Sequence, residues 1–407
     1  MTTPTNTRGS LSPSILLLLV VLTGWSGFAL LPRLGRRLGV ADGGQWFVDS
    51  YAVLAASDAV RAGLDPFQPN PLDVYNRLHS YSHWWFVLGD LGFTRKDNFL
   101  LGGSWVLAFL AACVLIARPT GWRQALMDGA VLLSPPVLLA VNRANNDLVV
   151  FIMLAGGLWF LREARLWRLV AFAALLLLAT GLKFYPILAA AVLLLVRPPR
   201  RMWLVSAAAA LAGVVVLATL RSDLRQAVIL APVGLYTFGV PVIFRDLGWT
   251  GHAPLGAGAV LLSLAAMVCV RRGWSVPLDD DAGDWRARCA YACGALLLTG
   301  CFLAGISYSY RLIHVVFLLP WLCQQRATPA ARWTGGLLVA TLWLDGLYCL
   351  VLNTFVGPMP VDRLVHLQML WRFVTQPVAW AAMALLAGSL LNMLLATVRE
   401  TRKAATA

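Results

Sequence analysis

The chain has 407 residues, of which 59% are hydrophobic and 13% are charged, and its mean hydropathy is +0.72. Repeated apolar runs of about 15–20 residues exclude one large soluble core and predict an all-α protein that crosses a membrane many times. The formal net charge of +14 comes mainly from arginine. Because these arginines flank the apolar runs in small groups, we interpret them as topology signals and lipid-headgroup contacts and expect no nucleic-acid partner.

The apolar runs predict a polytopic transmembrane helical bundle of about 12 spans that forms a single integral-membrane domain over residues 1–407. Several runs are shorter than the roughly 20 residues of a full crossing. We expect these to extend into flanking polar residues or to lie beside cavities. The runs lie near 12–31, 99–117, 124–141, 147–161, 167–182, 184–196, 203–220, 254–271, 289–306, 311–323, 333–352 and 376–398.

The short loops predict the orientation of the bundle. Loops rich in arginine, such as those around Arg118 and Arg200, alternate with loops that carry a single cation. An excess of Arg and Lys marks the cytoplasmic side, so we expect a plasma (inner) membrane protein with both termini in the cytoplasm. The long connections then face outside: residues 32–98, 221–254 and 353–375.

The first of these loops, Pro32–Asn98, is the longest polar stretch of the chain. Loops of this length are often functional. Within it, 49–60 has the pattern of a short amphipathic helix, which Gly63–Pro66 should end. Asp49 heads that helix, where the helix dipole favours an ionised carboxylate. We regard Asp49 as the first candidate for catalysis and helix capping as its alternative; Asp42 and Asp58 come next, with Tyr51 as a possible substrate contact.

Three single cations lie in the outer short loops: Arg143, Lys183 and Arg311. Each stands where an apolar segment is expected to start back into the membrane. A helix N-terminus with a cation beside it is suited to phosphate, so the three predict a phosphate site if they converge. The alternative is that each side chain extends to the lipid headgroups.

Several neighbours of these cations join the candidate site. Asp147 is either a local partner of Arg143 or a substrate contact, and His314 either shares the phosphate or has a structural role. Asn146, Tyr185 and Tyr310 are further possible substrate contacts. His79 and His83 have the i,i+4 spacing of metal ligands, but no carboxylate or cysteine accompanies them at a matching spacing. We therefore expect no metal and no cofactor, and interpret the seven cysteines as buried small hydrophobes.

Four motifs resemble those of a known enzyme family. They are VDSY with GLDPF in the first loop, NRANNDLVVF at 142–151, GLKFYPILAA at 181–190 and YRLIHVVFLLP at 310–320. In their order and spacing the chain resembles the GT-C superfamily of integral-membrane glycosyltransferases, and within it glycosyltransferase family 87, the polyprenyl-phosphate-mannose-dependent mannosyltransferases and their uncharacterised relatives. The first-loop motif reads DSY in this chain, where many members of the family have the pattern D-x-x-Y-Y.

The resemblance implies a GT-C-like fold, a catalytic acid in the first outer loop, which falls on Asp49, and a polyprenyl-phosphate-linked sugar donor. It also implies inverting transfer of a hexose such as mannose, at the outer leaflet, to a lipid or cell-envelope glycan acceptor. General-base chemistry at Asp49 and charge stabilisation by the three cations require no metal. The alternative is a polytopic transporter or lipid flippase, although we find no internal repeat; a non-enzymatic scaffold protein is the third interpretation.

Overall fold

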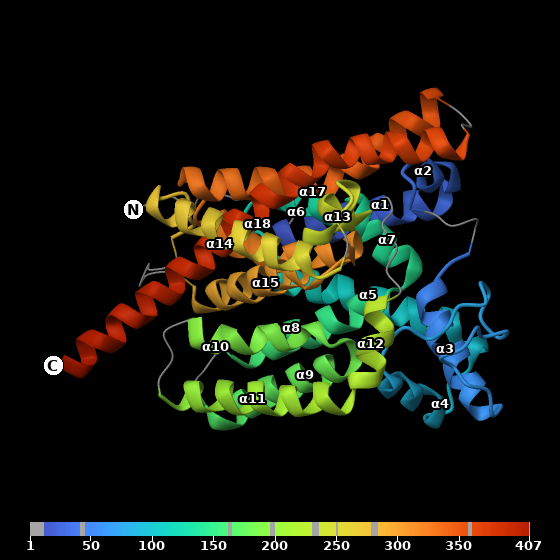
Figure 1. The fold of residues 1–407 in the computed structure, drawn as a ribbon, viewed down its shortest axis with the longest axis horizontal. Helices are drawn as coiled ribbons and strands as arrows, with labels where there is room; N and C mark the ends of the chain where they lie inside the picture. The colour runs from blue at the N-terminus through green and yellow to red at the C-terminus, as the bar shows by residue number, and fades with distance from the viewer. Residues whose placement is uncertain are drawn as a thin grey trace, which may run out of the picture.

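Long helices that lie side by side in one bundle dominate the structure, a computed structural model (Figure 1). It describes residues 12–40, 45–161, 165–195, 200–229, 236–249, 251–277, 284–356 and 360–406. The strands within these ranges, β1 (Thr237–Phe238) and β2 (Ser307–Tyr308), are short and pair antiparallel. The prediction of an all-α protein is confirmed.

Seven helices of the described residues are long and apolar enough to cross a membrane. A bent pair of helices, α6 (Trp122–Leu132) and α7 (Pro135–Arg143), makes an eighth if its 59° bend lies within one span. The seven are α1 (Pro13–Leu30), α5 (Asn98–Ala117), α9 (Leu166–Lys183), α14 (Ala253–Arg271), α15 (Trp285–Ala304), α17 (Pro329–Val351) and α18 (Val361–Thr406). The chain therefore has the architecture of a multi-pass membrane protein.

Fewer helices reach full length than the twelve predicted segments. The remaining segments form shorter helices, because proline or polar residues interrupt them; Pro186, for example, lies at the start of η3 and Pro320 at the start of α16. A span count of twelve stays a prediction. The shorter elements are α8 (Asn146–Phe160), η3 (Tyr185–Ala191) with α10 (Val192–Leu195), and η4 (Ser309–Leu318) with α16 (Leu319–Gln324). Helix α11 (Arg200–Thr219) has 20 residues, but its apolar part is the shorter stretch Leu204–Thr219.

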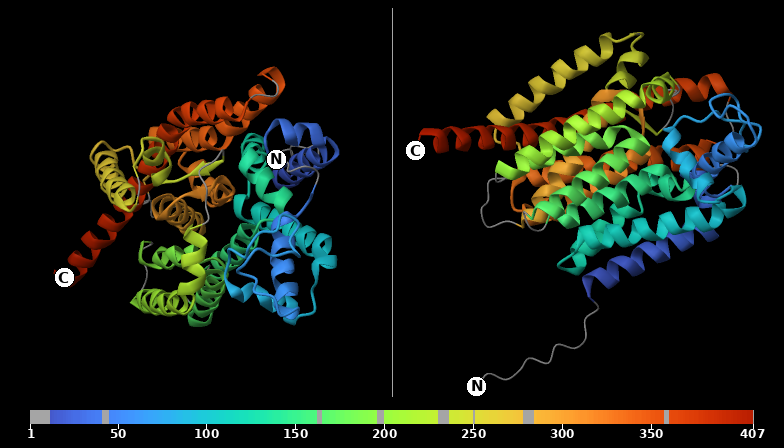
Figure 2. Two further views of the ribbon diagram at one scale, coloured as in Figure 1. Left: turned by 45° about the vertical axis from the view of Figure 1, so that its right-hand side comes forward. Right: turned by 90° about the horizontal axis from the view of Figure 1, so that it is seen from below.

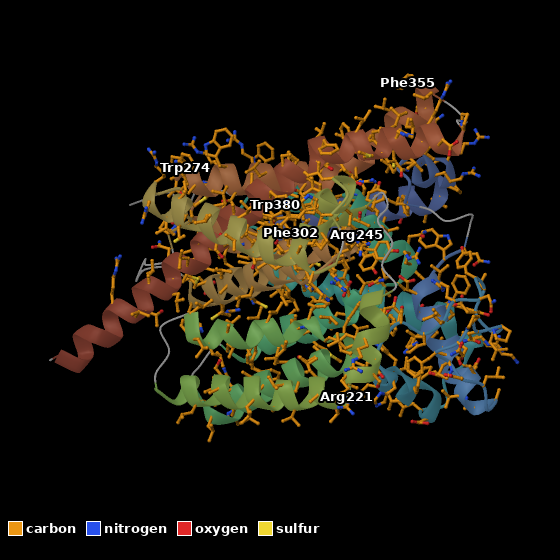
Figure 3. The ribbon with its side chains drawn as sticks, in the orientation of Figure 1. Arg221, Arg245, Trp274, Phe302, Phe355 and Trp380 are labelled. Carbon is orange, nitrogen blue, oxygen red and sulfur yellow. The ribbon has the colours of Figure 1, made fainter. Side chains whose placement is uncertain are left out.

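Helix α15 is the central helix of the bundle, and most of its residues are buried. It packs against η3, η4, α16 and α18. Phe302 of α15 and Trp380 of α18 meet edge to face, with their ring centroids 5.2 Å apart (Figure 3). This central contact ties the last helix of the chain to the core.

Two of the predicted outer loops are more helical than the sequence indicated. The predicted loop at 221–254 contains α12 (Arg221–Ile229) and α13 (Val240–Asp246). Most of the predicted loop at 353–375 is helical, since η5 (Leu352–Val356) extends α17 and α18 already begins at Val361. Its place outside the membrane stays a prediction. No glycine or proline interrupts residues 361–376, so the helix continues through them.

The first loop folds over one end of the bundle, as two further views confirm (Figure 2). It contains α2 (Pro32–Arg37), α3 (Val48–Arg61), η1 (His83–Phe86), α4 (Val87–Asp90) and η2 (Arg95–Asp97). Helix α3 confirms the predicted amphipathic helix, and Gly63, in a left-handed conformation (φ +72°), follows its end. The polar face is buried as well, because α3 is covered by α5 and α7 on one side and by η1 and α4 on the other.

Two tryptophans anchor this loop to the end of α9. The Trp85 indole N–H donates to the Leu182 carbonyl at 3.1 Å. The Trp84 ring lies against Gly181 so closely that a Cβ built on Gly181 would lie 1.9 Å from a ring carbon. The loop is therefore held in place directly beside Lys183.

We expect Gly181→Ala to loosen the loop, because the added methyl group and the Trp84 ring cannot occupy the same space. Limited proteolysis within residues 62–82 should become several-fold faster. The matched control is Gly103→Ala in α5, where a Cβ meets nothing within 4 Å and alanine should stabilise the helix by about 1 kcal/mol. Equal proteolysis of Gly181→Ala and the wild type would contradict the anchoring role of Trp84.

Candidate functional site

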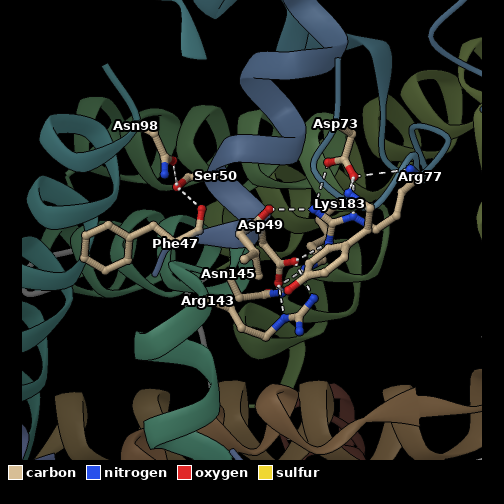
Figure 4. Close-up of polar contacts among 11 residues, drawn as sticks. Phe47, Asp49, Ser50, Asp73, Arg77, Asn98, Arg143, Asn145 and Lys183 are labelled. Atoms are coloured by element: carbon tan, nitrogen blue, oxygen red, sulfur yellow. Dashed lines mark hydrogen bonds and ion pairs between the residues drawn. The ribbon is translucent and has the colours of Figure 1, made fainter. Parts of the chain in front are cut away.

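Asp49 lies in the first turn of α3 and is almost fully buried, with 2% of its surface exposed. The start of this helix is fixed by Phe47, whose backbone N–H donates to the Asn142 carbonyl of α7 at 2.8 Å. The Arg143 guanidinium binds Asp49 through two atoms, with Nε 3.0 Å from Oδ2 and Nη2 2.9 Å from Oδ1. Asn145 donates to Oδ2 at 2.6 Å and Arg77 to Oδ1 at 3.3 Å (Figure 4).

These contacts determine the charge of Asp49. Burial by itself would raise the pKa of the carboxyl, but the charge and hydrogen bonds of Arg143, the Asn145 amide and the charge of Arg77 outweigh it and leave the pKa below its usual value. Asp49 is therefore ionised at neutral pH. An ionised carboxylate is the form that accepts a proton, although its donors must release it before it does so.

Asn145 connects Asp49 to a second ion pair. Its side-chain oxygen accepts a hydrogen bond from Lys183 Nζ at 3.0 Å and from the backbone N–H of Asp147 at 2.9 Å. Lys183 also lies 3.0 Å from Asp147 Oδ1, and both side chains are buried. Asn145 is the N-cap of α8, and it also bridges the two carboxylates.

The network continues to two side chains of the sequence-predicted site. The Tyr185 hydroxyl donates to Asp147 Oδ1 at 2.7 Å and lies 2.8 Å from His314 Nε2. Arg311 lies over the Tyr185 ring, 5.0 Å from its centroid, and donates to Ser307 Oγ at 2.7 Å. The structure thus gathers Arg143, Lys183 and Arg311 around one connected set of polar side chains.

Aromatic rings surround the ammonium group of Lys183. Nζ lies 5.2 Å from the ring centroid of Tyr81 and 5.4 Å from that of Tyr310. Such cation–π contacts stabilise a desolvated cation. Tyr310 stacks in turn on Tyr308, with centroids 5.4 Å apart. Lys183 is therefore fixed by ring faces as well as by Asp147 and Asn145.

Some buried polar atoms of this site have no hydrogen-bond partner among the described residues. They include both side-chain polar atoms of Asn146, Oδ2 of Asp147 and Nδ1 of His314. Unsatisfied buried polar groups are rare in folded proteins because each one costs about 1–3 kcal/mol. Their grouping beside three cations is what a site for a polar ligand would need.

The structure corrects the expected placement of two cations. Arg143 is the last residue of α7 and Lys183 the last of α9, so neither lies at the N-terminus of a helix. Both follow the rule that a helix C-terminus favours cations. Asp147, offered above as a partner of Arg143, forms its ion pair with Lys183 instead.

Two other sequence candidates lie away from this network. Asp58 pairs with Arg61 and with Arg95, and Tyr51 also interacts with Arg95. At 100° per residue, positions two and nine residues after Asp49 point to the opposite side of α3, which explains the separation. Asp42 lies outside the described residues.

Two of the residues that hold Asp49 were not predicted from the sequence. They are Arg77 and Asn145. Arg77 also binds Asp73, with Nη2 2.9 Å from Oδ2, and donates to the Val48 carbonyl at 2.7 Å. Nothing in the sequence around Arg77 indicates this role, since Arg77 reaches α3 from an irregular part of the loop. The residue type of Asn145 did carry a signal, because asparagine favours the N-cap position of a helix. A capping role alone does not predict the hydrogen bond to Asp49.

His79 and His83 do not form a metal site in the structure. His79 Nε2 donates to the Ser82 carbonyl at 3.1 Å, whereas His83 Nδ1 donates to Asp223 at 2.8 Å. No group of three or more metal-ligating side chains with suitable geometry occurs among the described residues. The two histidines instead connect parts of the first loop to each other and to α12.

Acidification should destabilise the first loop through His79. Burial lowers the pKa of His79 from 6.5 to about 4, despite the opposing hydrogen bond to Ser82. The unfolded loop therefore binds this proton more readily, and stability is lost as the pH falls from about 6.5 toward 4, by up to about 3 kcal/mol. Thermal unfolding of the wild type and His79→Phe between pH 4 and pH 7 checks this: the difference between their melting temperatures should depend on pH. A constant difference would contradict it.

Comparison with known proteins adds no further identification, since no family model, curated protein or solved structure matches the chain.

Proposed function

We propose that the chain is a membrane glycosyltransferase that uses a polyprenyl-phosphate-linked sugar donor. The observation that carries the proposal is the network around Asp49: a loop carboxylate held by Arg143 and joined through Asn145 to Lys183. It places a candidate base beside cations at the end of an apolar bundle. This arrangement suits a substrate with a phosphate, a sugar and a long apolar chain.

In the proposed reaction Asp49 takes the proton of an acceptor hydroxyl. The hydroxyl oxygen forms a bond to the anomeric carbon of the sugar, the bond from that carbon to the phosphate oxygen breaks, and polyprenyl phosphate leaves with the electron pair. The configuration inverts, as in inverting glycoside chemistry. The negative charge that develops on the leaving phosphate is stabilised by Arg143, Lys183 and Arg311.

The lowered pKa of Asp49 places one condition on this reaction. A carboxylate held by two atoms of Arg143 is a weak base. The guanidinium must therefore move from Asp49 to another anion before Asp49 takes the proton. The donor phosphate is that anion, because an arginine fork binds phosphate as well as it binds carboxylate. Donor binding would then release Asp49 for the acceptor, and the enzyme would remain unreactive without its donor.

The remaining features of the proposal follow from the arginine-rich short loops and from the resemblance to family 87. Both termini would lie in the cytoplasm, the site would face outside, and the sugar would be a hexose such as mannose. The acceptor would be a lipid or a cell-envelope glycan. The proposed reaction uses no metal ion.

A transfer assay tests the proposal. Purified protein in vesicles receives polyprenyl-phosphate mannose labelled in the sugar, together with envelope lipids as acceptors. We expect the label to move to a new product while an equal amount of polyprenyl phosphate appears.

A second candidate function is a proton-coupled transporter, which the connected series of buried polar side chains would also suit. The series consists of Asp49, Asn145, Lys183, Asp147, Tyr185 and His314. Label that crosses the vesicle membrane while still attached to its donor would favour that alternative.

A further inference from the structure

A second candidate site lies at the opposite end of the bundle from Asp49. Ser50, next to Asp49, donates to Asn98 at the start of α5 at 2.6 Å. Helix α5 has 20 residues and is therefore about 30 Å long. Along the second half of α5, a cavity of about 960 Å³ opens between α5, α8, α15 and α16. This volume is at the upper end of the range for small-molecule sites.

Small side chains create the space for this cavity. Alanine and glycine from three helices face it, so the helices pack without filling the volume between them. Larger apolar side chains, among them Leu115, Ile116 and Ile152, form the rest of the wall. The small residues are Ala108, Ala111, Ala112 and Ala117 of α5, Ala155 and Gly156 of α8, and Ala287 and Ala290 of α15.

The mouth of the cavity is basic. Among the described residues, three arginines line it, Arg118, Arg286 and Arg326, and Asp284 is the single acidic residue that does so. The guanidinium groups of Arg118 and Arg286 lie over the Trp159 ring, at 5.5 Å and 5.6 Å from its centroid. One ring thus contacts two cations that line an apolar cavity.

We propose that this cavity binds an anionic phospholipid, with the phosphate at the three arginines and an acyl chain along the alanine-rich wall. The combination of a basic mouth and an apolar interior matches a molecule with a charged head and a hydrocarbon tail. Arginine suits the head, because its planar fork binds phosphate oxygens in pairs. The arginine-rich loops place this end in the cytoplasmic leaflet, where anionic lipids attract basic residues.

Cys323 offers a reporter for this site. It lines the cavity and is partly exposed, whereas the other six cysteines are buried. The protein in detergent is treated with N-ethylmaleimide, and the first addition is followed by intact mass. We expect phosphatidylglycerol to slow this addition about tenfold, whereas phosphatidylcholine and soluble glycerol phosphate leave it unchanged. Equal protection by phosphatidylcholine, or protection by glycerol phosphate alone, would overturn the proposal.

Variants of the mouth make the test specific. Arg326→Gln alters an exposed residue, and Arg118→Gln with Arg286→Gln removes both cations from Trp159. Both variants should lose most of the protection by phosphatidylglycerol. The matched control is Arg123→Gln, since Arg123 lies over the Trp122 ring at 5.2 Å but does not line the cavity. If the double variant does not fold, the protection of Cys323 in Arg326→Gln decides the question. Full protection by phosphatidylglycerol in that variant would overturn the proposal.

Discussion

Replacing Asp49 with asparagine should lower the rate of sugar transfer by about 10²–10⁴-fold, the usual contribution of a general base. Asparagine has the same shape as aspartate and keeps one acceptor oxygen for Arg143, so the loop helix should stay in place. It cannot take up the proton of the acceptor hydroxyl. Donor binding should persist, because the cations that hold the phosphate are unchanged. Turnover and donor binding by the purified variant, measured side by side, check both parts.

Asp58→Asn is the matched control for this variant. Asp58 lies on the same helix, but its partners are Arg61 and Arg95 rather than the network around Asp49. We expect Asp58→Asn to transfer sugar at close to the wild-type rate. Near-normal turnover by a well-folded Asp49→Asn protein would remove the catalytic role from Asp49.

Lys183→Met should be the most destabilising single substitution in the site, with a loss of about 3–5 kcal/mol. Lys183 and Asp147 are both buried, with 5% and 0% of their side-chain surfaces exposed. Removal of the cation leaves a buried carboxylate without its counter-charge, and the neutral Tyr185 hydroxyl, which donates to Asp147 Oδ1, cannot replace it. Thermal unfolding of the purified variant measures the loss.

Adding Asp147→Asn to this variant separates stability from function. The double variant has no unpaired buried charge, so most of the stability should return, as it does when both members of a buried pair are replaced. Sugar transfer should not return, because the lysine that binds phosphate is still missing. A stable double variant that transfers sugar at the wild-type rate would show that the pair only supports the fold.

The sequence predicts the fold class and its principal loop because both follow from local composition. Apolar runs fix the long helices, and the pattern of 49–60 predicts α3 to within a residue or two. The number of full-length spans is harder to predict. A run such as 184–196 is apolar enough for a membrane, yet it begins as a 3-10 helix at Tyr185, with Pro186 in the first turn, and stays short.

The candidate site is predictable in its residue types but not in its pairings. Lys183 and Arg143 attract notice because isolated charges beside apolar segments are unusual, and Asp49 because it heads an amphipathic helix in the long first loop. The partnership of Asp49 and Arg143 joins residues 94 positions apart, and it depends on how the loop packs against α7. Likewise, we predicted from the sequence that Arg143 and Lys183 lie where helices begin, whereas α7 and α9 end at these two residues.

The most direct test of the central claim is a density map of the protein with polyprenyl phosphate bound. We expect the phosphate to lie among Arg143, Lys183 and Arg311, with Arg143 turned from Asp49 toward the phosphate and the Asp49 carboxylate open to an acceptor. A phosphate bound elsewhere, with Asp49 still held by Nε and Nη2 of Arg143, would contradict the account.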